Sequence, residues 1–502
     1  MRFLAQELFL NKMINYDLHF STRTRQLKSK IIVFTFCFVV SVVLSQNLVA
    51  ETFVPSPWQE TTKSIGHYSH LPTGLLTKDE LQELIDIGEA LFAAKFTLTD
   101  GAGRPAATQA ILPTKVRKQA ENLFSRTSGS DANACVSCHN DPLPGGAGDF
   151  VTNVFVSEGF TIADFDSTDP QFSNERGTNH LFGAGLIELL AREMSAELIQ
   201  LRSQALTQAR KKNEPIRIPL KTKGVSFGFL TTFPDGLVDL KEVEGIDNDL
   251  IVRPFSQKGV MTSLRQFTIN ALNHHHGMQA SERFGERWTG EKDFDEDGRN
   301  NELAPADISA LVAWQATLPA PVMEKTKNKK WHQAATKGQQ FFNDIGCQSC
   351  HRSSLPLTSL SFSDPGPLDN AGTLQSNQVD KPAIYDLQLL KWAQQLPRNN
   401  NGEILVPLFG DLKRHKMTDR QVDDFGNELL SQRFVNRNIF MTAELWGVAS
   451  TSPYGHRNDM TTLDQVIRAH GGASRQSRER YVNADQKQRS NLIAFLKLMV
   501  IQ

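Results

Sequence analysis

Two short stretches of the chain share one pattern of thiols and an imidazole. Cys135-Val136-Ser137-Cys138-His139 and Cys347-Gln348-Ser349-Cys350-His351 both read C-x-x-C-H. In this pattern the two thiols can form thioether bonds to the vinyl groups of one haem, and the adjacent imidazole is held where it can bind the iron. Each stretch therefore predicts one covalently bound haem c. The predicted attachment residues are Cys135, Cys138, Cys347 and Cys350, and the predicted proximal iron ligands are His139 and His351.

The cysteine count favours this interpretation over its alternatives. The chain has five cysteines, and four of them lie in the two motifs. The fifth, Cys37, lies in a segment that we expect to be removed. A single motif could be a redox dithiol or half of a zinc site, but each pair here carries its own adjacent histidine. We therefore predict two haem c groups and no unassigned thiol in the mature protein.

The first 50 residues have the layout of a secretory signal. Four basic residues between Arg23 and Lys30 precede an apolar run from Ile31 to Leu44, and small residues follow. This run is shorter than the roughly 20 residues that a membrane-spanning helix needs. We expect residues 1–50 to be a signal peptide, with a retained anchor as the alternative, and we expect no stable membrane insertion. Because c-type haem is attached outside the cytoplasm in bacteria, the expected location is the periplasm.

Composition limits the function classes. The chain has 502 residues, 39% hydrophobic and 22% charged, which is typical of a soluble globular protein with two or three domains. Removal of residues 1–50 would change the formal net charge from -1 to about -5. An acidic mature protein is no candidate for binding nucleic acid.

Helical patterns recur around the two motifs. A capping box, Thr77 to Glu80, opens an amphipathic helix, and a short helix near 115–124 precedes the first motif. Residues 336–345 predict a helix directly before the second motif. Residues 307–314 and 490–496 predict two closing helices, each with an apolar face and an aromatic residue in the same place. We infer an internal duplication.

The duplication defines the expected fold, a mainly α protein with two cytochrome c-like haem domains and small β insertions. We expect an N-terminal domain with insertions at 75–318, a solvated linker at 319–331 and a C-terminal domain at 332–502. Within the first domain, residues 194–212 predict a helix, whose basic end, 210–212, we interpret as solvated and complementing the helix dipole rather than as a docking patch. Residues 225–239 predict a short hairpin.

Several further stretches, taken in order with the motifs, resemble the bacterial di-haem oxidoreductase family grouped with peroxidases. More distantly, they resemble the di-haem cytochrome c peroxidases and the di-haem enzyme that matures tryptophan-derived quinones. The resemblance covers nearly all of the chain after about residue 75. The stretches are Pro144-Gly145-Gly146, Asn174-Glu175-Arg176-Gly177, Leu181-Phe182-Gly183-Ala184-Gly185-Leu186-Ile187-Glu188, Ser263-Leu264-Arg265-Gln266-Phe267, Leu445-Trp446-Gly447, Pro453-Tyr454, Thr462-Leu463 and His470-Gly471-Gly472.

The resemblance implies that one haem takes up electrons and the other, with an open or displaceable sixth position, meets peroxide or substrate. It also implies a small redox protein as electron donor or acceptor and a small-molecule oxidant. One stretch departs from the family pattern. Where the family tail reads Tyr-x-His-Asp-Gly, this chain has Arg457 and Asn458 after His456. We therefore expect the glycine-dependent turn to be missing, and we carry no family role over to His456.

Sixth ligands of the irons have several candidates. For the second haem we favour Met417, in a stretch similar to a family segment with His and Met, over Met441 and Met460. For the first haem the densest group of ligands is 274–278, from which we select His276. A helix end with solvated histidines is the alternative there. Four tryptophans could lie between the haems and carry electrons, or be core residues: Trp288, Trp314, Trp331 and Trp446.

A second metal site is predicted by three carboxylates at alternate positions. Asp293, Asp295 and Asp297 are followed by Gly298, as at the start of a calcium loop. The twelfth position is Ala304, which cannot bind the ion, although Asn301 or Glu302 could take its place by another chain path. An acidic, solvent-facing loop is the alternative.

Two classes of function remain at this point. The first is an enzyme, a peroxidase-like oxidoreductase with one electron-entry haem and one reactive haem. The second is a di-haem electron-transfer cytochrome without its own substrate, and a haem-dependent oxygenase is a third alternative. The sequence assigns no catalytic acid or base.

Overall fold

The computed structural model describes residues 66–68, 70–108, 113–117, 134–149, 151–156, 173–427 and 435–502. These residues belong to one compact unit, Thr62–Gln502. They form helices and small sheets of two or three strands, which confirms the prediction of helical structure with small β insertions. The predicted signal peptide and most of the helix expected near 115–124 lie outside the described residues. Among the described helices, none has the length and apolar composition needed to cross a membrane.

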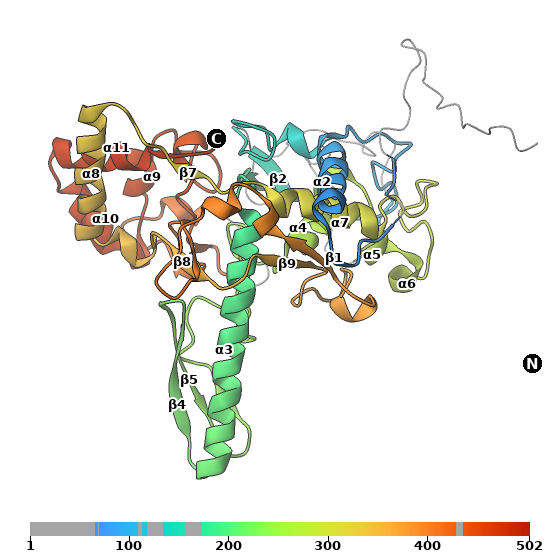
Figure 1. The fold of residues 1–502 in the computed structure, drawn as a ribbon, viewed down its shortest axis with the longest axis horizontal. Coiled ribbons are helices and arrows are strands. Elements are labelled where there is room, and N and C mark those ends of the chain that lie inside the picture. Colours follow the sequence, from blue (N-terminus) through green and yellow to red (C-terminus); the bar gives the residue numbers. More distant parts are fainter. Residues whose placement is uncertain are drawn as a thin grey trace, which may run out of the picture. The chain divides into compact units, whose positions relative to one another are not determined.

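The first half opens and closes with helices that pack on each other. Helix α2 (Lys78–Ala93) begins at the predicted capping box, in which the Glu80 N–H donates to Thr77 Oγ1. It packs against α7 (Pro305–Thr317), and the two lie side by side in Figure 1. The crossing needs a glycine, because a Cβ at Gly88 would lie 2.0 Å from the carbonyl oxygen of Ala310 and 2.8 Å from Trp314 Cβ.

The second half repeats this crossing. Helix α8 (Lys329–Asp344) packs against α11 (Gln486–Leu496). A Cβ at Gly338 would lie 1.9 Å from the Asn491 carbonyl oxygen and 2.9 Å from Phe495 Cβ. In both crossings a Cβ on the glycine would meet a backbone carbonyl of the partner helix. It would also meet the aromatic residue four positions after that carbonyl. This shared detail supports the predicted duplication.

The expected linker, 319–331, is partly regular structure. Strand β7 (Val322–Met323) pairs antiparallel with β14 (Met499–Val500). Helix α8 begins at Lys329, earlier than the pattern at 336–345 indicated, because the Asn328 side chain accepts from two backbone N–H groups of the first turn. The Trp331 indole also donates to the Ala494 carbonyl at 2.9 Å and fixes this turn on α11.

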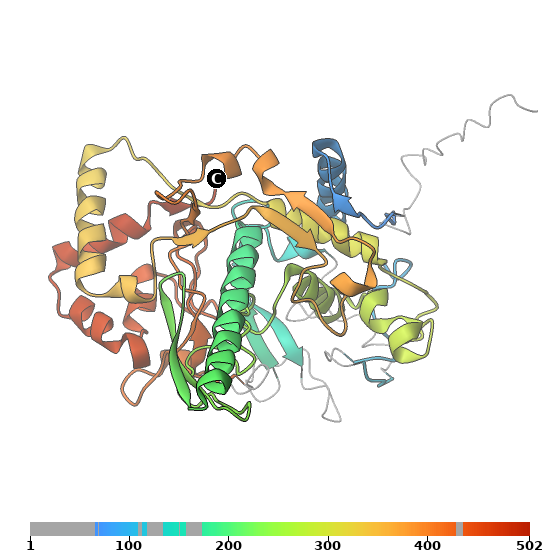
Figure 2. The ribbon, with the colours of Figure 1, turned by 60° about the horizontal axis from the view of Figure 1, so that its bottom comes forward.

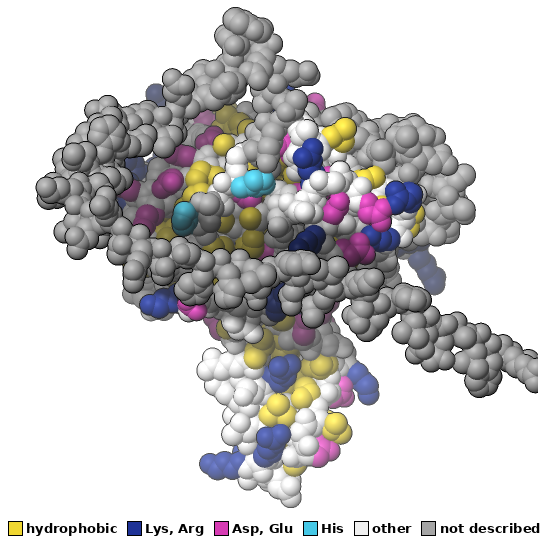
Figure 3. All heavy atoms as spheres, turned by 90° about the vertical axis from the view of Figure 1, so that its right-hand side faces the viewer, with side chains coloured by type: hydrophobic (Ala, Val, Ile, Leu, Met, Phe, Trp, Pro, Cys, Tyr) yellow, Lys and Arg dark blue, Asp and Glu magenta, His cyan; other side chains and the backbone are white. Residues whose placement is uncertain are grey.

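An insertion in the first half forms a lobe of one helix and three strands. Helix α3 (Ala184–Lys212) is longer than the predicted 194–212 because its first turns, through Ala191, are buried. Strands β4 (Ile216–Thr222), β5 (Val225–Thr232) and β6 (Val238–Asp239) form an antiparallel sheet beside it, as Figures 1 and 2 show. The predicted hairpin at 225–239 is thus confirmed, with β4 as an added strand. Basic, acidic and hydrophobic side chains are interspersed on the lobe in Figure 3.

The remaining elements are short and surround the two motifs. The helices are η3 (Cys135–Ser137), α4 (Leu264–Ala271), η4 (Leu272–His276), α5 (Ser281–Phe284), α6 (Glu286–Thr289), η5 (Cys347–Ser349), η6 (Ser376–Gln378), η7 (Leu387–Leu389), η8 (Ala393–Gln395), η9 (Asp424–Gly426), η10 (Val448–Ser450), α9 (Leu463–Arg468), η11 (Gly472–Ser474) and α10 (Arg475–Val482). The strands are β1 (Gly74–Leu75), β2 (Val151–Val156), β3 (Ser173–Gly177), β8 (Leu355–Leu357), β9 (Ser361–Asp364), β10 (Ala383–Asp386), β11 (Ile404–Val406), β12 (Arg414–Lys416) and β13 (Ile439–Met441).

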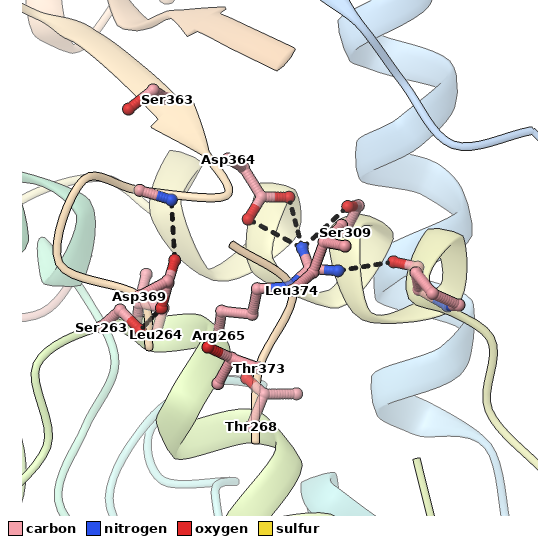
Figure 4. Close-up of polar contacts among 12 residues, drawn as sticks. Ser263, Leu264, Arg265, Thr268, Ser309, Ser363, Asp364, Asp369, Thr373 and Leu374 are labelled. Carbon is pink, nitrogen blue, oxygen red and sulfur yellow. Dashed lines mark hydrogen bonds and ion pairs between the residues drawn. The ribbon is translucent and has the colours of Figure 1, made fainter. Parts of the chain in front are cut away.

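Segments from the two halves are joined by a strand pairing and by one buried arginine. Strand β1 pairs parallel with β10, which pairs antiparallel with β9. Arg265 of α4 is 1% exposed and donates to both carboxylate oxygens of Asp364 in β9 at 2.8 and 2.9 Å, as Figure 4 shows. It also donates to Glu282 and to Ser309 Oγ. A buried guanidinium with its donors shared among segments of both halves fixes α4, which carries the histidine-rich turn, relative to the second half.

Candidate haem cavity

The backbone folds both motifs into the same turn. Residues Cys135–Ser137 and Cys347–Ser349 form 3₁₀ turns. The His139 N–H donates to the Cys135 carbonyl at 3.1 Å, and the His351 N–H donates to the Cys347 carbonyl at 3.0 Å. Each turn therefore holds its two thiols and its imidazole in a single compact group, as attachment to one haem requires.

Both motif histidines are oriented through one ring nitrogen. His139 Nδ1 lies 3.3 Å from the Gly146 carbonyl oxygen, and His351 Nδ1 lies 3.2 Å from the Phe409 carbonyl oxygen. A carbonyl can only accept, so Nδ1 carries the proton and Nε2 keeps its lone pair. Burial lowers the pKa of each imidazole to about 4, which keeps it neutral. A neutral imidazole anchored through Nδ1 is the form that binds a metal through Nε2.

The thiols do not fit the alternative sites. Burial raises the pKa of Cys135 and Cys347 to about 12 and that of Cys138 to about 11, so these thiols lack the thiolate character of a redox dithiol. The two pairs also do not converge on one metal, because the closely spaced groups of metal-binding side chains among the described residues contain only Cys350 of the four. The residues present therefore fit haem attachment better than a dithiol or zinc site.

One continuous cavity of about 500 Å³ connects the two motifs. Its lining includes both His139 and His351, although 212 positions separate them in the sequence. Between them it is lined by side chains from the long α3 insertion, from the histidine-rich turn after α4 and from the C-terminal tail. The shared cavity places both predicted haems in one connected interior.

His470 lies opposite His351 in this cavity. The two ring centres are 6.4 Å apart, and both residues line the cavity. His470 Nδ1 is 2.7 Å from the Val466 carbonyl, so its Nε2 is also the unprotonated nitrogen. Two imidazoles on opposite sides of one metal, each at about 2 Å, have ring centres roughly 6 Å apart. Sequence analysis named His470 only as part of a family tail and missed this pairing, which joins residues 119 positions apart.

The methionine candidates lie near the same motif. Met417 follows β12 and lines the cavity, and its side chain packs against the apolar cluster of Phe425, Phe440, Met460 and Ala469. Met441 also lines the cavity. Met417 thus remains a candidate sixth ligand beside His470, whose ring centre lies 6.4 Å from that of His351.

His415 lies beside the second motif at the Cys350 sulfur. Its Nε2 is 2.8 Å from Asp411 Oδ2, and these two residues form a close group with Cys350. Burial alone would lower the pKa of His415, but the hydrogen bonds to Asp411 and Cys350 raise it to about 9. Asp411 therefore anchors the His415 imidazole beside the predicted attachment sulfur of Cys350.

The histidine run beside the first motif forms a π-helical turn, Leu272–His276. Gly277 ends it at φ +68°, where a Cβ would lie 2.5 Å from the backbone nitrogen of Gly103. His276 Nε2 lies 3.4 Å from Cys135 Sγ, while His274 and His275 line the cavity. The predicted ligand His276 is therefore next to the first motif, at the sulfur of the predicted attachment residue Cys135. Wide turns of this kind occur often at functional sites.

Of the four tryptophans, Trp446 lines the cavity. It is 2% exposed, and its carbonyl accepts from His180 Nε2 at 3.2 Å. Burial lowers the pKa of His180 to about 4, and the neighbouring His139 contributes to this. Trp314 and Trp331 pack in the two helix crossings, and Trp288 is 41% exposed. Among the four tryptophans, the structure therefore places only Trp446 at the cavity, which the sequence could not predict.

The turn after His456 is present although its family glycine is not. Asn458 takes the left-handed conformation, φ +53°, that glycine would supply. The chain reverses there, since the Tyr454 N–H donates to the Met460 carbonyl at 2.6 Å. The expectation of a missing turn was therefore wrong, because asparagine tolerates this conformation. His456 is 5% exposed and lines the cavity, and burial, with the charges of Arg176, Lys258 and Arg457, lowers its pKa to about 2.

The three predicted calcium ligands converge. One carboxylate oxygen each from Asp293, Asp295 and Asp297 lie within 4.8 Å of one another. Asp295 is 0% exposed, and neither of its oxygens has a hydrogen-bond partner among the described residues. Burial, together with Asp297 and Asp293, raises the pKa of Asp295 to about 8. Burial also raises the pKa of Glu302, with Asp295 as the next cause, which places a fourth carboxylate near this group. A solvent-facing loop does not explain a fully buried, unpartnered aspartate.

This carboxylate group is linked to the histidine-rich turn. The Ala106 N–H donates to the Asp295 carbonyl at 2.8 Å. Arg104, two residues earlier and fully buried, donates to the Asn273 carbonyl within the turn at 2.7 Å. The Gln279 N–H donates to Glu302 just after the turn. Two routes therefore connect the acidic loop to the first motif.

No protein-family model and no curated protein matches the chain. The solved structures that it distantly resembles include the following two. Hydrazine synthase of Kuenenia stuttgartiensis, in a structure pressurized with xenon, is 13% identical over 88% of this chain and 97% of that chain, with a TM-score of 0.35. A MauG-like protein associated with microbial copper homeostasis is 12% identical over 86% and 93%, with a TM-score of 0.32. The function of the chain is therefore inferred from the cavity itself.

Proposed function

We propose that this chain is an exported di-haem c-type oxidoreductase, peroxidase-like, built from two cytochrome c-like haem domains and acting in the periplasm. The observation that carries the proposal is the single cavity lined by the histidines of both C-x-x-C-H motifs. A carrier with two independent haems has no need for a shared interior. Two haem c groups bound there would supply one-electron chemistry and a site for peroxide at an open coordination position.

The residues around the motifs support different roles for the two haems. We propose that Cys347, Cys350 and His351 hold the electron-entry haem, with His470 as its sixth ligand in place of Met417. The support is the 6.4 Å separation of the two rings and the anchoring of both through Nδ1. We propose that Cys135, Cys138 and His139 hold the reactive haem.

Near the reactive haem, the histidine-rich turn supplies neutral polar groups. Its cavity-lining residue His275 has a pKa held well below the usual value, first by burial and then by its neighbours His274, His276 and His139. A neutral imidazole can accept a proton from a bound peroxide and orient it. We propose His275 for this role. The predicted iron ligand His276 lies at the Cys135 sulfur instead.

We further propose that Trp446 lies on the electron path between the two haems. It lines the shared cavity, and its carbonyl is joined through His180 to the surroundings of His139. Trp446→Phe should keep both haems and their potentials while slowing electron transfer between them. Equal inter-haem rates in the parent and the variant would exclude this path.

The proposed activity is tested on protein matured with haem-attachment machinery. Mass spectrometry should show two haem additions, and the half-reduced protein should react with hydrogen peroxide while the spectrum of only one haem changes. Two haems with no reaction toward peroxide would favour the electron-transfer or oxygenase alternatives.

We also propose that Asp293, Asp295 and Asp297 bind calcium, with Glu302 as a further ligand. The buried, unpartnered carboxylate of Asp295 carries this proposal, because a hard divalent cation would satisfy its oxygens and offset the repulsion among the carboxylates. Isothermal titration with Ca²⁺ should show one site, and the Asp295→Asn variant should lose it. An unchanged titration in the variant would place the ion elsewhere.

A further inference from the structure

The helices that open the two halves carry opposite charge. Helix α2 has five acidic residues and one basic residue, and all six are exposed. Helix α8 has three basic residues, Lys329, Lys330 and Lys337, against Asp344, and all four are exposed. The two helices occupy equivalent places before their motifs, so the scaffold does not require this difference.

Basic residues continue from α8 to the second motif. Helix α10 carries three arginines and one glutamate. From it, the exposed Arg480 reaches the carbonyl oxygens of Asp344 and Ile345 at 3.4 and 3.5 Å. These carbonyls lie directly before the motif. Helices α8 and α10 together hold six basic and two acidic residues, and two of the six, Arg475 and Arg478, form ion pairs with Asp419 and Glu479. We give the name basic face to the four exposed basic residues that remain, Lys329, Lys330, Lys337 and Arg480.

The second motif is also more exposed to solvent than the first. Gln348 and Ser349, between the two cysteines, are exposed, whereas Val136 and Ser137 of the first motif are half-buried. The covalent edge of the second haem would therefore lie at the surface beside Arg480. A redox protein that docks there would approach the haem without entering the cavity.

We propose that the basic face is the docking surface for a small, acidic redox protein that exchanges electrons with the second haem. This inference rests on the proposed function, because it assumes a haem at Cys347 and Cys350. A positive surface attracts an acidic partner and raises its association rate, and salt weakens the effect. The acidic helix α2 repels the same partner and directs it away from the first haem. We propose a protein partner rather than an anionic membrane, because an exposed haem edge can exchange electrons with a redox protein and not with lipid.

The test uses the holoprotein and stopped-flow reduction by two protein donors, an acidic plant-type ferredoxin and a basic cytochrome c, each reduced beforehand. The two donors differ in reduction potential as well as in charge, so each is compared with itself across salt concentrations. The rate of reduction by the ferredoxin should fall as ionic strength rises, and the rate of reduction by the cytochrome should rise or stay constant. The Lys337→Glu, Arg480→Glu double variant should lower that rate about tenfold at low salt. The matched control is Glu83→Lys, Asp86→Lys on α2, which should change it by less than about twofold.

Three results would overturn the proposal. They are a rate of reduction by the ferredoxin that does not fall with ionic strength, a larger effect of the α2 variant than of the basic-face variant, and salt-sensitive binding to phosphatidylglycerol vesicles together with a ferredoxin rate that the basic-face variant leaves unchanged. Far-ultraviolet circular dichroism and the haem spectrum confirm that the variants are folded. Failure of the peroxide reaction leaves this test intact, because charge-steered reduction of the second haem needs no peroxide. Absence of haem at the second motif would refute both proposals.

Discussion

The two haem motifs lie on the same scaffold but in different surroundings. Each follows a helix that crosses a closing helix at a glycine, Gly88 in one half and Gly338 in the other. Each forms a 3₁₀ turn, and each histidine is anchored through Nδ1 to a backbone carbonyl. These shared features are the ones that attachment of a haem would need, and we infer that the duplication preserved them.

The surroundings have diverged. The second motif faces His470 and lies beside basic helices, while the first lies beside an acidic helix, a π-helical turn of histidines and the carboxylates around Asp295. A sixth ligand and a basic surface suit the uptake of electrons, and an imidazole-lined interior suits a reacting ligand. If the proposed function holds, one attachment unit used twice acquires two roles through residues outside the motif.

The largest expected effect is the loss of one haem when either pair of motif cysteines is removed. The Cys135→Ala, Cys138→Ala variant should lose the first haem, and the Cys347→Ala, Cys350→Ala variant should lose the second, because no other thiols lie in the motifs. Intact-protein mass spectrometry after maturation should show one haem addition in each variant and two in the parent. Two additions in either variant would mean that its motif does not attach haem.

Loss of the arginine that joins the halves should strongly destabilise the fold. Arg265→Met leaves Asp364 and Glu282 buried without their partner, and we expect about 3–5 kcal/mol less free energy of unfolding in urea. The control is Arg217→Met, which removes an ion pair with Glu242 whose partners are about half exposed, and should leave the free energy of unfolding nearly unchanged. Similar losses in the two variants would show that the buried network does not hold the halves together.

Removal of calcium should destabilise the first half of the protein. Excess chelator should lower the free energy of unfolding by about 3 kcal/mol if the ion was present at roughly 100 times its Kd. It should also change the spectrum of the first haem, through Arg104 and the histidine-rich turn. The Asp295→Asn variant should not respond to chelator. A change confined to the second haem would contradict the connection described here.

The helix crossings predict a smaller, symmetrical effect. Gly88→Ala and Gly338→Ala each place a Cβ about 2 Å from a backbone carbonyl oxygen, and each should cost about 1–3 kcal/mol through overpacking. Gly66→Ala is a suitable control, because a Cβ there meets nothing within 4 Å. Thermal unfolding followed by circular dichroism measures all three. A loss at one crossing only would argue that the two halves are not equivalent in packing.

Local patterns in the sequence predicted the parts of this structure that depend on local chemistry. The capping box at Thr77 begins α2, the closing helices form at α7 and α11, and the hairpin after α3 is present. The spacing of Asp293, Asp295 and Asp297 also predicted their convergence. Each of these features depends on residues that are close together in the chain. The sequence therefore shows it as a periodic pattern or as a fixed spacing.

Features that depend on distant residues were not predictable in this way. The pairing of His470 with His351, the position of Trp446 and the network of Arg265 each join segments about 100 or more positions apart. A histidine in a Gly-rich tail has no sequence signal that marks it as facing a haem motif. The turn at Asn458 was misjudged for another reason, since the left-handed conformation is available to asparagine as well as to glycine.

The most direct test of the central claim, two haems with different coordination in one cavity, is the electron paramagnetic resonance spectrum of the oxidised holoprotein. It should contain one low-spin signal typical of two imidazole ligands and one high-spin signal. His470→Ala should convert the low-spin signal to high spin, while Met417→Ala should leave both unchanged. Two low-spin signals, or a low-spin signal that depends on Met417 and not on His470, would contradict the proposed division between the two haems.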